Sequence, residues 1–189
     1  MPPPLRLALL EAPPTFRTER LCIRPLTETD DTGILRLRSN PQVVRYLGVA
    51  PLESLAEARL LIRQRHSERD RYESCTWSIL SDAGLPLIGT LSVFKFDERH
   101  RKVEIGYSLL PQYWRLGYTT EALGVLLPWL YGTFGAHRLT AEIDPANRAS
   151  AALLRKLGFR REAYFREAYL VGESYTDSEI YCRLAEDTA

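Results

Sequence analysis

The chain has 189 residues, of which 45% are hydrophobic and 26% charged, and its formal net charge is +1. This length predicts one domain that is large enough to bury a substantial core. A net charge near zero argues against a generic nucleic-acid-binding protein, which would carry a basic stripe. We find no apolar run of membrane-spanning length and no signal peptide, so we expect a cytoplasmic protein that does not bind membranes.

The three cysteines, Cys22, Cys75 and Cys182, are odd in number and far apart in the sequence. They lack the spacing of metal ligands, so we expect neither disulfide bonds nor a bound metal. A reducing cytoplasm fits this pattern.

The chain is expected to hold one domain over residues 16–184. Residues 1–15 contain most of a proline cluster and are interpreted as a tail or an arm on the surface. Residues 185–189 are interpreted as a C-terminal tail. Alternating side chains between Phe16 and Pro25 predict the first strand.

Two helical regions are predicted next. Thr27 and Asp30 are typical of an N-cap region and precede an apolar run that suits a helix. Asn40-Pro41 ends this helix, and a short helical piece is expected after it. The segment from Ser54 to Arg69 predicts a longer helix with one apolar face.

The middle of the chain predicts three antiparallel strands in succession. Tyr72 to Leu80 and Leu87 to Phe96 read as strands around a turn at Asp82-Ala83-Gly84. Asp97 to His100 gives a second turn, which leads into a strand that contains Glu104.

The last third of the chain predicts a strand, a helix and a hairpin. Arg138 to Ile143 is a short strand that follows a helix, so we expect it to pair parallel to the Glu104 strand. Ala151 to Leu157 is helical and is ended by Gly158. Phe159 to Val171 and Tyr175 to Leu184 are expected to form the closing hairpin.

The stretch from Glu104 to Leu123 predicts a site for an anion. It begins as a strand that ends at Pro111, and a helix opens at Gly117 with Glu121 in its first turn. The first N–H groups of a helix lack internal partners, and the helix dipole favours negative charge there. A phosphate could therefore approach the chain closely around Gly117.

Pro128 lies inside the apolar run that continues this helix. It deletes the hydrogen bond to the carbonyl of Gly124. We therefore expect the helix to bend or loosen around Gly124 and Val125.

This stretch resembles motif A of the GNAT superfamily of N-acetyltransferases, in which the loop holds the pyrophosphate of acetyl-coenzyme A. The RimJ/RimL-type branch commonly reads E-I-G-Y…P-x-Y-W-G-x-G-Y-A-T-E-A, and this chain departs from it at Arg115 and Thr119. A second segment, Asn147-x-x-Ser150…Leu157-Gly158-Phe159, matches the superfamily's N-x-x-S…L-G-F pattern. The resemblance implies cofactor-binding residues at Leu109, Leu110, Arg115, Leu116, Gly117, Tyr118, Thr119, Thr120 and Asn147.

The resemblance also implies the fold and the reaction. We expect an α+β GNAT-like acyl-CoA N-acyltransferase fold, with a mixed and mostly antiparallel sheet that is splayed open and flanked by helices. The expected reaction moves an acetyl group from acetyl-CoA to a primary amine by direct attack in a ternary complex. The acceptor could be a protein N-terminus, a polyamine or an antibiotic-like amine, and a homodimer is left open. A weakly catalytic acyl-CoA sensor or scaffold, and a transferase for longer acyl groups, also remain open.

Glu104 is the candidate general base. Its strand places it opposite Val103, Ile105 and Tyr107 and toward the cleft, and the superfamily often has a carboxylate here that acts through water. The alternative is a surface carboxylate that pairs with a neighbour such as Lys95. Glu142 is the next carboxylate to test.

Ser150 is the candidate general acid, because Leu154 stands where the superfamily usually has a tyrosine that serves as the general acid. The RimJ/RimL-type branch uses the serine in this way. The alternative for Ser150 is an N-cap hydroxyl. Asn147 is expected to fix the pantetheine arm, or simply to form an Asx turn.

Overall fold

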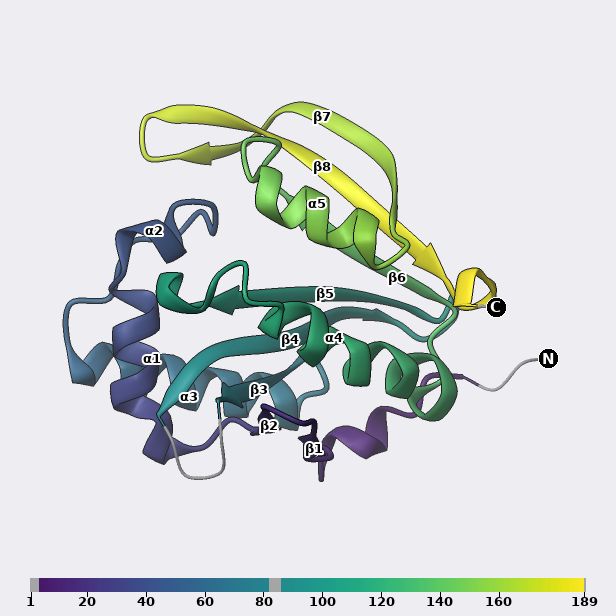
Figure 1. Ribbon diagram of the computed structural model, residues 1–189, viewed down its shortest axis with the longest axis horizontal. Coiled ribbons are helices and arrows are strands. Elements are labelled where there is room, and N and C mark those ends of the chain that lie inside the picture. The colour runs from purple at the N-terminus through teal and green to yellow at the C-terminus, as the bar shows by residue number, and fades with distance from the viewer. Residues whose placement is uncertain (1–3, 82–85, 189) are drawn as a thin grey trace.

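The computed structural model describes residues 4–81 and 86–188 and shows one mixed sheet with helices on both faces (Figure 1). The predicted turn at Asp82-Ala83-Gly84 lies outside the described residues. The strand order in the described sheet is β1-β2-β3-β4-β5-β6-β8-β7. The strands are β1 (Phe16–Arg17), β2 (Cys22–Pro25), β3 (Ser74–Leu80), β4 (Leu87–Asp97), β5 (Lys102–Leu109), β6 (Arg138–Ile143), β7 (Arg160–Val171) and β8 (Ser174–Leu184).

The helices cover the two faces of this sheet and build two hydrophobic clusters. In Figure 1, α4 lies in front of the sheet and α3 behind it. The larger cluster packs the sheet against α4 and α5, and the smaller one packs α1 and α3 around Leu87 and Leu110. The helices are α1 (Asp31–Arg38), α2 (Pro41–Val44), α3 (Leu55–Asp70), α4 (Tyr118–Trp129) and α5 (Arg148–Lys156). No helix within the described ranges is long and apolar enough to cross a membrane.

Most helix boundaries follow the expected local signals. Thr27 and Asp30 form a reciprocal capping box before α1, and the Asn40 side chain caps α2. The Ser54 hydroxyl caps α3. Gly158 follows α5 with a φ angle of +83°, a left-handed conformation that suits glycine at this place.

The stretch 16–25 forms two short strands: the alternation of Leu21 and Ile23 predicts the second of them, and the first is an addition. Phe16–Arg17 pairs with Cys22–Pro25 in an antiparallel hairpin. The intervening turn directs Thr18 and Arg20 away from the ladder and toward Glu121 on α4. These long-range contacts separate the two strands.

The N-terminal segment packs into the core, in contrast to the expected surface arm. Leu5 and Leu10 are buried in the main cluster, and residues Leu7–Leu10 form a 3₁₀ turn. The Arg6 N–H donates to the carbonyl of Phe134, and the Trp77 indole donates to the carbonyl of Pro14. This segment is therefore part of the domain.

The C-terminal residues continue the fold beyond β8. Ala185–Thr188 form a 3₁₀ turn. The Leu184 N–H donates to the carboxylate of Asp187, and the Ala185 N–H donates to the carbonyl of His137.

The irregularity caused by Pro128 comes later than expected. α4 continues through Gly124, Val125 and Pro128 as an α-helix, and a π-helical turn follows at Leu130–Phe134. The missing proline N–H is thus accommodated by widening the helix after Pro128 rather than by loosening it before.

The sheet opens between its two central strands. β5 and β6 pair in parallel, as predicted, but only from Lys102 opposite Arg138 to Glu104 opposite Thr140. Beyond Glu104 the two strands separate, and Figure 1 shows β6, β7, β8 and α5 diverging from β5 and α4. This opening positions the site described below.

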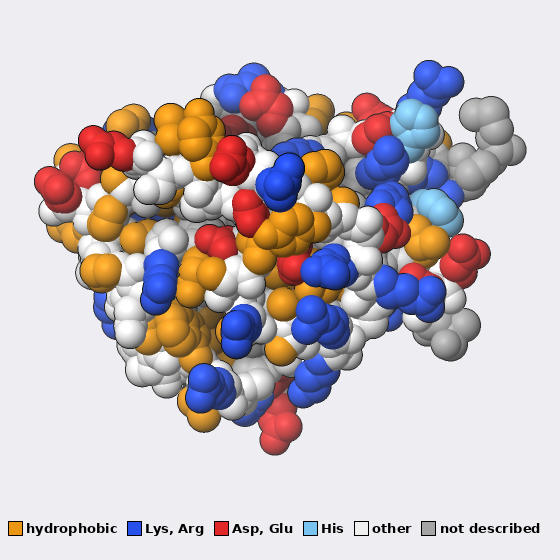
Figure 2. Space-filling model, turned by 90° about the horizontal axis from the view of Figure 1, so that it is seen from above, with side chains coloured by type: hydrophobic (Ala, Val, Ile, Leu, Met, Phe, Trp, Pro, Cys, Tyr) orange, Lys and Arg blue, Asp and Glu red, His pale blue; other side chains and the backbone are white. Residues whose placement is uncertain are grey.

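The hairpin of β7 and β8 projects from the body, and its edge strand β7 is largely exposed. Exposed hydrophobic side chains lie along it, and Figure 2 shows hydrophobic groups on this face of the molecule. They include Tyr164, Phe165, Tyr169, Leu170 and Tyr175.

Candidate active site

The edge of β5 that borders the opening carries free backbone groups. In an antiparallel ladder, alternate residues direct their N–H and C=O groups to the same neighbouring strand. The Leu110 N–H donates to Ile88 at 2.9 Å, so the backbone of Leu109, Tyr107 and Ile105 points the other way, toward β6.

This alternation separates the two residues expected to pair with pantetheine. Leu109 faces the opening, and its carbonyl accepts a hydrogen bond from the Trp114 indole at 2.6 Å. Leu110 faces β4, and its carbonyl accepts from Tyr113 at 2.9 Å. Leu110 therefore offers no free N–H donor, whereas the N–H of Leu109 lies on the correct side.

The N-terminus of α4 has the free N–H groups that the predicted anion cradle requires. Gly117 precedes the helix with a φ angle of +83°, and no side chain caps it. The N–H groups of Tyr118, Thr119 and Thr120 thus lack helical acceptors and converge beside an exposed glycine. Arg115 and Leu116 lie on the exposed loop before them, where Arg115 has a φ angle of +60°.

Arg20 supports this cradle from the β1–β2 turn. Its guanidinium donates to Glu121 and to the carbonyl of Leu116, and it lies 4.4 Å from the Tyr118 ring centroid. Burial alone would raise the pKa of Glu121, but hydrogen bonds from Thr18 and Arg20 lower it overall. Glu121 is therefore ionised and paired, so its charge does not oppose an anion at the helix terminus.

A buried tyrosine hydroxyl lies between β5 and α5. The Tyr107 hydroxyl is inaccessible and has no hydrogen-bond partner among the described residues. The side chain of Ser150, on α5, acts to lower the pKa of Tyr107. Burial has the larger effect and raises that pKa to about 12.

Asn147 caps α5, so the interpretation of Ser150 as the N-cap is wrong. The Asn147 side-chain oxygen accepts from the Ser150 N–H at 3.1 Å, so the capping group is the asparagine. The Ser150 hydroxyl is therefore not the N-cap. It remains available on the side of α5 that faces Tyr107.

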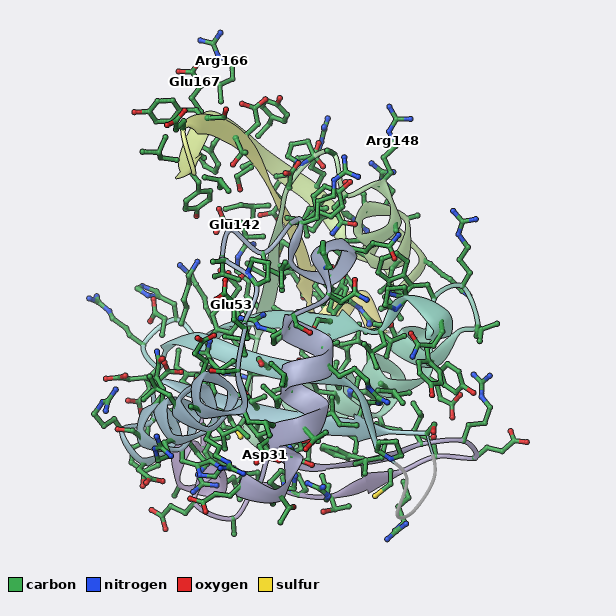
Figure 3. The ribbon with its side chains drawn as sticks, turned by 90° about the vertical axis from the view of Figure 1, so that its left-hand side faces the viewer. Asp31, Glu53, Glu142, Arg148, Arg166 and Glu167 are labelled. Atoms are coloured by element: carbon green, nitrogen blue, oxygen red, sulfur yellow. The ribbon has the colours of Figure 1, made fainter. Side chains whose placement is uncertain are left out.

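Two carboxylates and one ammonium gather where β5 and β6 separate. Lys95 Nζ lies 3.0 Å from Glu104 Oε1 and 3.2 Å from Glu142 Oε2. The other oxygen of Glu142 accepts from Tyr169 at 2.5 Å and from Ser178 at 2.6 Å. Figure 3 shows Glu142 at the base of the β7–β8 hairpin, above the sheet. The ion pair with Lys95, which the alternative interpretation of Glu104 expects, is thus present within a larger cluster.

The two carboxylates have opposite pKa shifts. Burial raises the pKa of Glu104, and the nearby Glu142 adds to this against the opposing effect of Lys95. Burial also acts on Glu142, but hydrogen bonds from Ser178, Tyr169 and Lys95 lower its pKa overall. Because their pKa values are shifted in opposite directions, one carboxylate suits a proton acceptor and the other a permanent anion.

These features fit a coenzyme A thioester. The cradle at α4 suits a pyrophosphate, and the free edge of β5 suits an amide chain. The profile of the family described as acetyltransferase (GNAT) domain matches residues 20–160. The chain belongs to the GNAT family.

Relatives of this GNAT protein agree with the assignment. The uncharacterized N-acetyltransferase YoaA of Bacillus subtilis (strain 168) is 31% identical over 169 residues, which cover 89% of this chain and 95% of that protein. The [ribosomal protein uS5]-alanine N-acetyltransferase of Escherichia coli (strain K12) is 32% identical over 73 residues, 39% of this chain and 38% of that protein. The chain is therefore an N-acetyltransferase of the GNAT type.

A solved structure shares the fold of this GNAT enzyme. RimL, described as a ribosomal L7/L12 alpha-N-protein acetyltransferase in complex with coenzyme A, superposes with a TM-score of 0.80. The superposition covers 90% of this chain and 98% of that chain at 19% sequence identity. The fold of the GNAT enzyme is thus the mixed, splayed sheet that was expected.

Sequence reasoning missed several residues of this GNAT site. Arg20, Tyr169 and Ser178 come from segments far from the two motifs, and nothing in their local sequence indicates a role. Tyr107 was recognised only as an alternating strand residue. A search for polar residues on the inner side of each strand would have suggested Ser178, but not the reach of Tyr169.

Proposed function

We propose that this enzyme transfers an acetyl group from acetyl-CoA to a primary amine by direct attack in a ternary complex, and that the acceptor is a protein N-terminus. The observation that carries the proposal is the Glu104–Lys95–Glu142 cluster at the mouth of the opening. An ammonium already lies between the two carboxylates. With both carboxylates ionised, the cluster keeps one negative charge beyond that of Lys95, which would attract the ammonium of an acceptor to the same place.

The chain's own groups would handle the protons of this reaction. Glu104 would accept a proton from the acceptor ammonium, directly or through water, because its raised pKa brings it nearer to the working pH. The freed amine would form the new N–C bond to the acetyl carbon as the C–S bond breaks. Ser150 would supply a proton to the departing thiolate and recover one from solvent.

Backbone groups would hold the acetyl-CoA. The N–H groups of Tyr118, Thr119 and Thr120 would receive the pyrophosphate, with Gly117, Arg115 and Leu116 forming the loop around it. The Leu109 N–H would pair with the pantetheine arm like an added strand. The amide nitrogen of Asn147, whose oxygen is used by the cap, would be free to donate to the same arm.

The choice of a protein N-terminus rests on similarity. The uS5-alanine N-acetyltransferase matches part of the chain, and RimL shares its fold. We would test the acceptor with a panel that compares alanine-initiated peptides, their N-acetylated controls, spermidine and an aminoglycoside. Turnover of the small amines alone would exclude the peptide proposal, and acetyl-CoA binding without any turnover would indicate a sensor or scaffold.

Glu104→Gln tests the base assignment. We expect it to bind acetyl-CoA normally, because the cradle at α4 is remote, and to lose about 10²-fold in rate with saturating acceptor at pH 7. Alkaline pH should restore part of the loss, since an α-amine titrates near pH 8. Rates should be measured from pH 6 to 10 with the exposed Glu98→Gln as control. A wild-type profile for Glu104→Gln would transfer the role to Glu142.

A further inference from the structure

A small polar cavity lies under the α1–α3 layer, on the same face of the sheet as Glu104. Its volume is about 60 Å³, enough for a carboxylate group. Its floor carries hydroxyl groups of Thr76, Thr90 and Ser92, and its walls include Arg38 and Arg65.

Arg38 lines this cavity without a counter-charge. Its guanidinium makes no hydrogen bond or ion pair within the described ranges, and burial, followed by repulsion from Arg65, lowers its pKa. Arg65 differs, because Glu68 pairs with it at 2.6 Å. One positive charge is therefore left uncompensated in the cavity.

The hydroxyl groups beside Arg38 are arranged to accompany an anion. Thr76 and Ser92 share a hydrogen bond at 2.9 Å, in which either oxygen can donate. Either hydroxyl can therefore turn a proton toward a ligand. Even a half-buried cation without a partner loses part of its hydration, and an anion that binds beside it offsets that cost.

We propose that Arg38 is the anchor of an anion subsite that receives a carboxylate of the acceptor. The proposal deepens the proposed function and rests on it, because it assigns the acceptor two charges of opposite sign. The amine lies at Glu104 and Glu142, and the carboxylate lies at Arg38.

The strand register places the floor of the cavity near Glu104. Ser92 is opposite Gly106 and Phe94 is opposite Glu104, so Ser92 and Glu104 are diagonal neighbours on adjacent strands. Such neighbours are about 7–8 Å apart. An extended peptide rises roughly 3.3 Å per residue, which would bring the third residue of a protein N-terminus to Ser92 and so to the cavity that Arg38 lines. The preferred acceptor is therefore an N-terminus with an acidic third residue.

The kinetic test uses three hexapeptide amides that begin with alanine and otherwise contain glycine. One carries glutamate at the third position, one glutamine at the third position, and one glutamate at the sixth. We expect the first to have a KM about tenfold lower than the other two, at similar kcat. Arg38→Met should remove this preference, so that the three peptides have similar KM values in that variant. Arg38→Lys should keep part of it, and the exposed Arg63→Met should keep all of it.

A binding test separates this subsite from the reaction itself. The Nε–H resonance of Arg38, assigned by its loss in Arg38→Met, should shift saturably with sodium acetate when coenzyme A is present in excess to fill the α4 cradle. The resonance of Arg63 should not shift. If acetate shifts Arg38 but no peptide is acetylated, the anion subsite stands and the proposed peptide acceptor fails.

Two results would overturn the subsite. If the Arg38 resonance does not shift with acetate, the cavity does not bind a carboxylate, and this conclusion is independent of the turnover measurements. Equal KM values for the three peptides in an active wild-type enzyme would show that Arg38 does not contact the acceptor.

Discussion

Lys95 sets the charge of the cluster at the mouth of the opening. Its ammonium contacts both Glu104 and Glu142, and its own backbone has a φ angle of +53° at an irregular part of β4. A non-glycine residue in this conformation is uncommon. The backbone is thus bent in a way that brings this side chain over the two carboxylates.

Lys95→Met should move the acid limb of the pH–rate profile toward higher pH. Lys95 lowers the pKa of Glu104, so its loss lets burial and Glu142 raise that pKa further. The ionised form of Glu104 is lost as pH falls through its pKa. A higher pKa therefore means that activity is lost at a higher pH. The measurement is kcat/KM between pH 5 and 9, with the exposed Lys102→Met as control. An unmoved limb would show that Glu104 is not the titrating base.

Alanine substitutions at Asn147 and Ser150 should have different effects, the first on stability and the second on catalysis. Asn147→Ala removes the cap of α5 and should cost about 1 kcal/mol in the free energy of unfolding. Ser150→Ala leaves that cap intact, so its cost should stay below about 0.5 kcal/mol. Its rate should instead fall by about 10²-fold, without recovery at alkaline pH. Urea unfolding and steady-state rates measure the two effects. A large stability loss in Ser150→Ala would contradict this division.

At the scale of elements, the α4 cradle depends on one backbone conformation. Gly117 has a positive φ angle, and a Cβ atom there would lie 3.5 Å from the guanidinium of Arg20. A side chain at this place therefore meets both strain and a cation. The effect of its charge can be isolated with two residues of the same shape.

Gly117→Asp should weaken coenzyme A binding by more than about tenfold, because the carboxylate would lie against the pyrophosphate. Gly117→Asn has nearly the same shape and tolerates a positive φ angle, so it should lose much less. Calorimetry with coenzyme A gives both affinities, and thermal unfolding checks the fold. Equal affinities for the two variants would move the phosphate site away from Gly117.

The sequence predicts those elements whose boundaries are set by residues close to them in the chain. The capping box at Thr27 and Asp30, the caps at Asn40 and Ser54, and Gly158 after α5 each depend on neighbours within a few residues. The turn between β1 and β2 depends instead on Glu121, which is 101 residues from Arg20. Periodicity contains no information about such a partner. The Glu104–Lys95–Glu142 cluster was only half anticipated for the same reason.

At the scale of the molecule, the N-terminal segment completes the core. Its prolines indicated a surface arm, but Leu10 is fully buried beside residues from the sheet and α4. The contact with Phe134 links positions far apart in the chain, so the sequence pattern could not reveal it.

Leu10→Ala should destabilise the protein by about 2–4 kcal/mol, the usual cost of a cavity in a packed core. The exposed Leu60→Ala on α3 should change stability by less than about 0.5 kcal/mol. Urea unfolding followed by circular dichroism compares the two. Matching midpoints would show that the N-terminal segment contributes little to the core.

The three cysteines are all free and all buried. Burial raises the pKa of Cys75 and of Cys182 to about 12, so these thiols are almost entirely protonated and unreactive at neutral pH. Each turnover of an acetyl-CoA-dependent enzyme releases one free thiol, on coenzyme A. A thiol-reactive dye should therefore react with free coenzyme A as it forms, and hardly at all with the buried cysteines of the protein. Every variant considered above keeps all three cysteines, so the whole series can be compared in a single continuous assay.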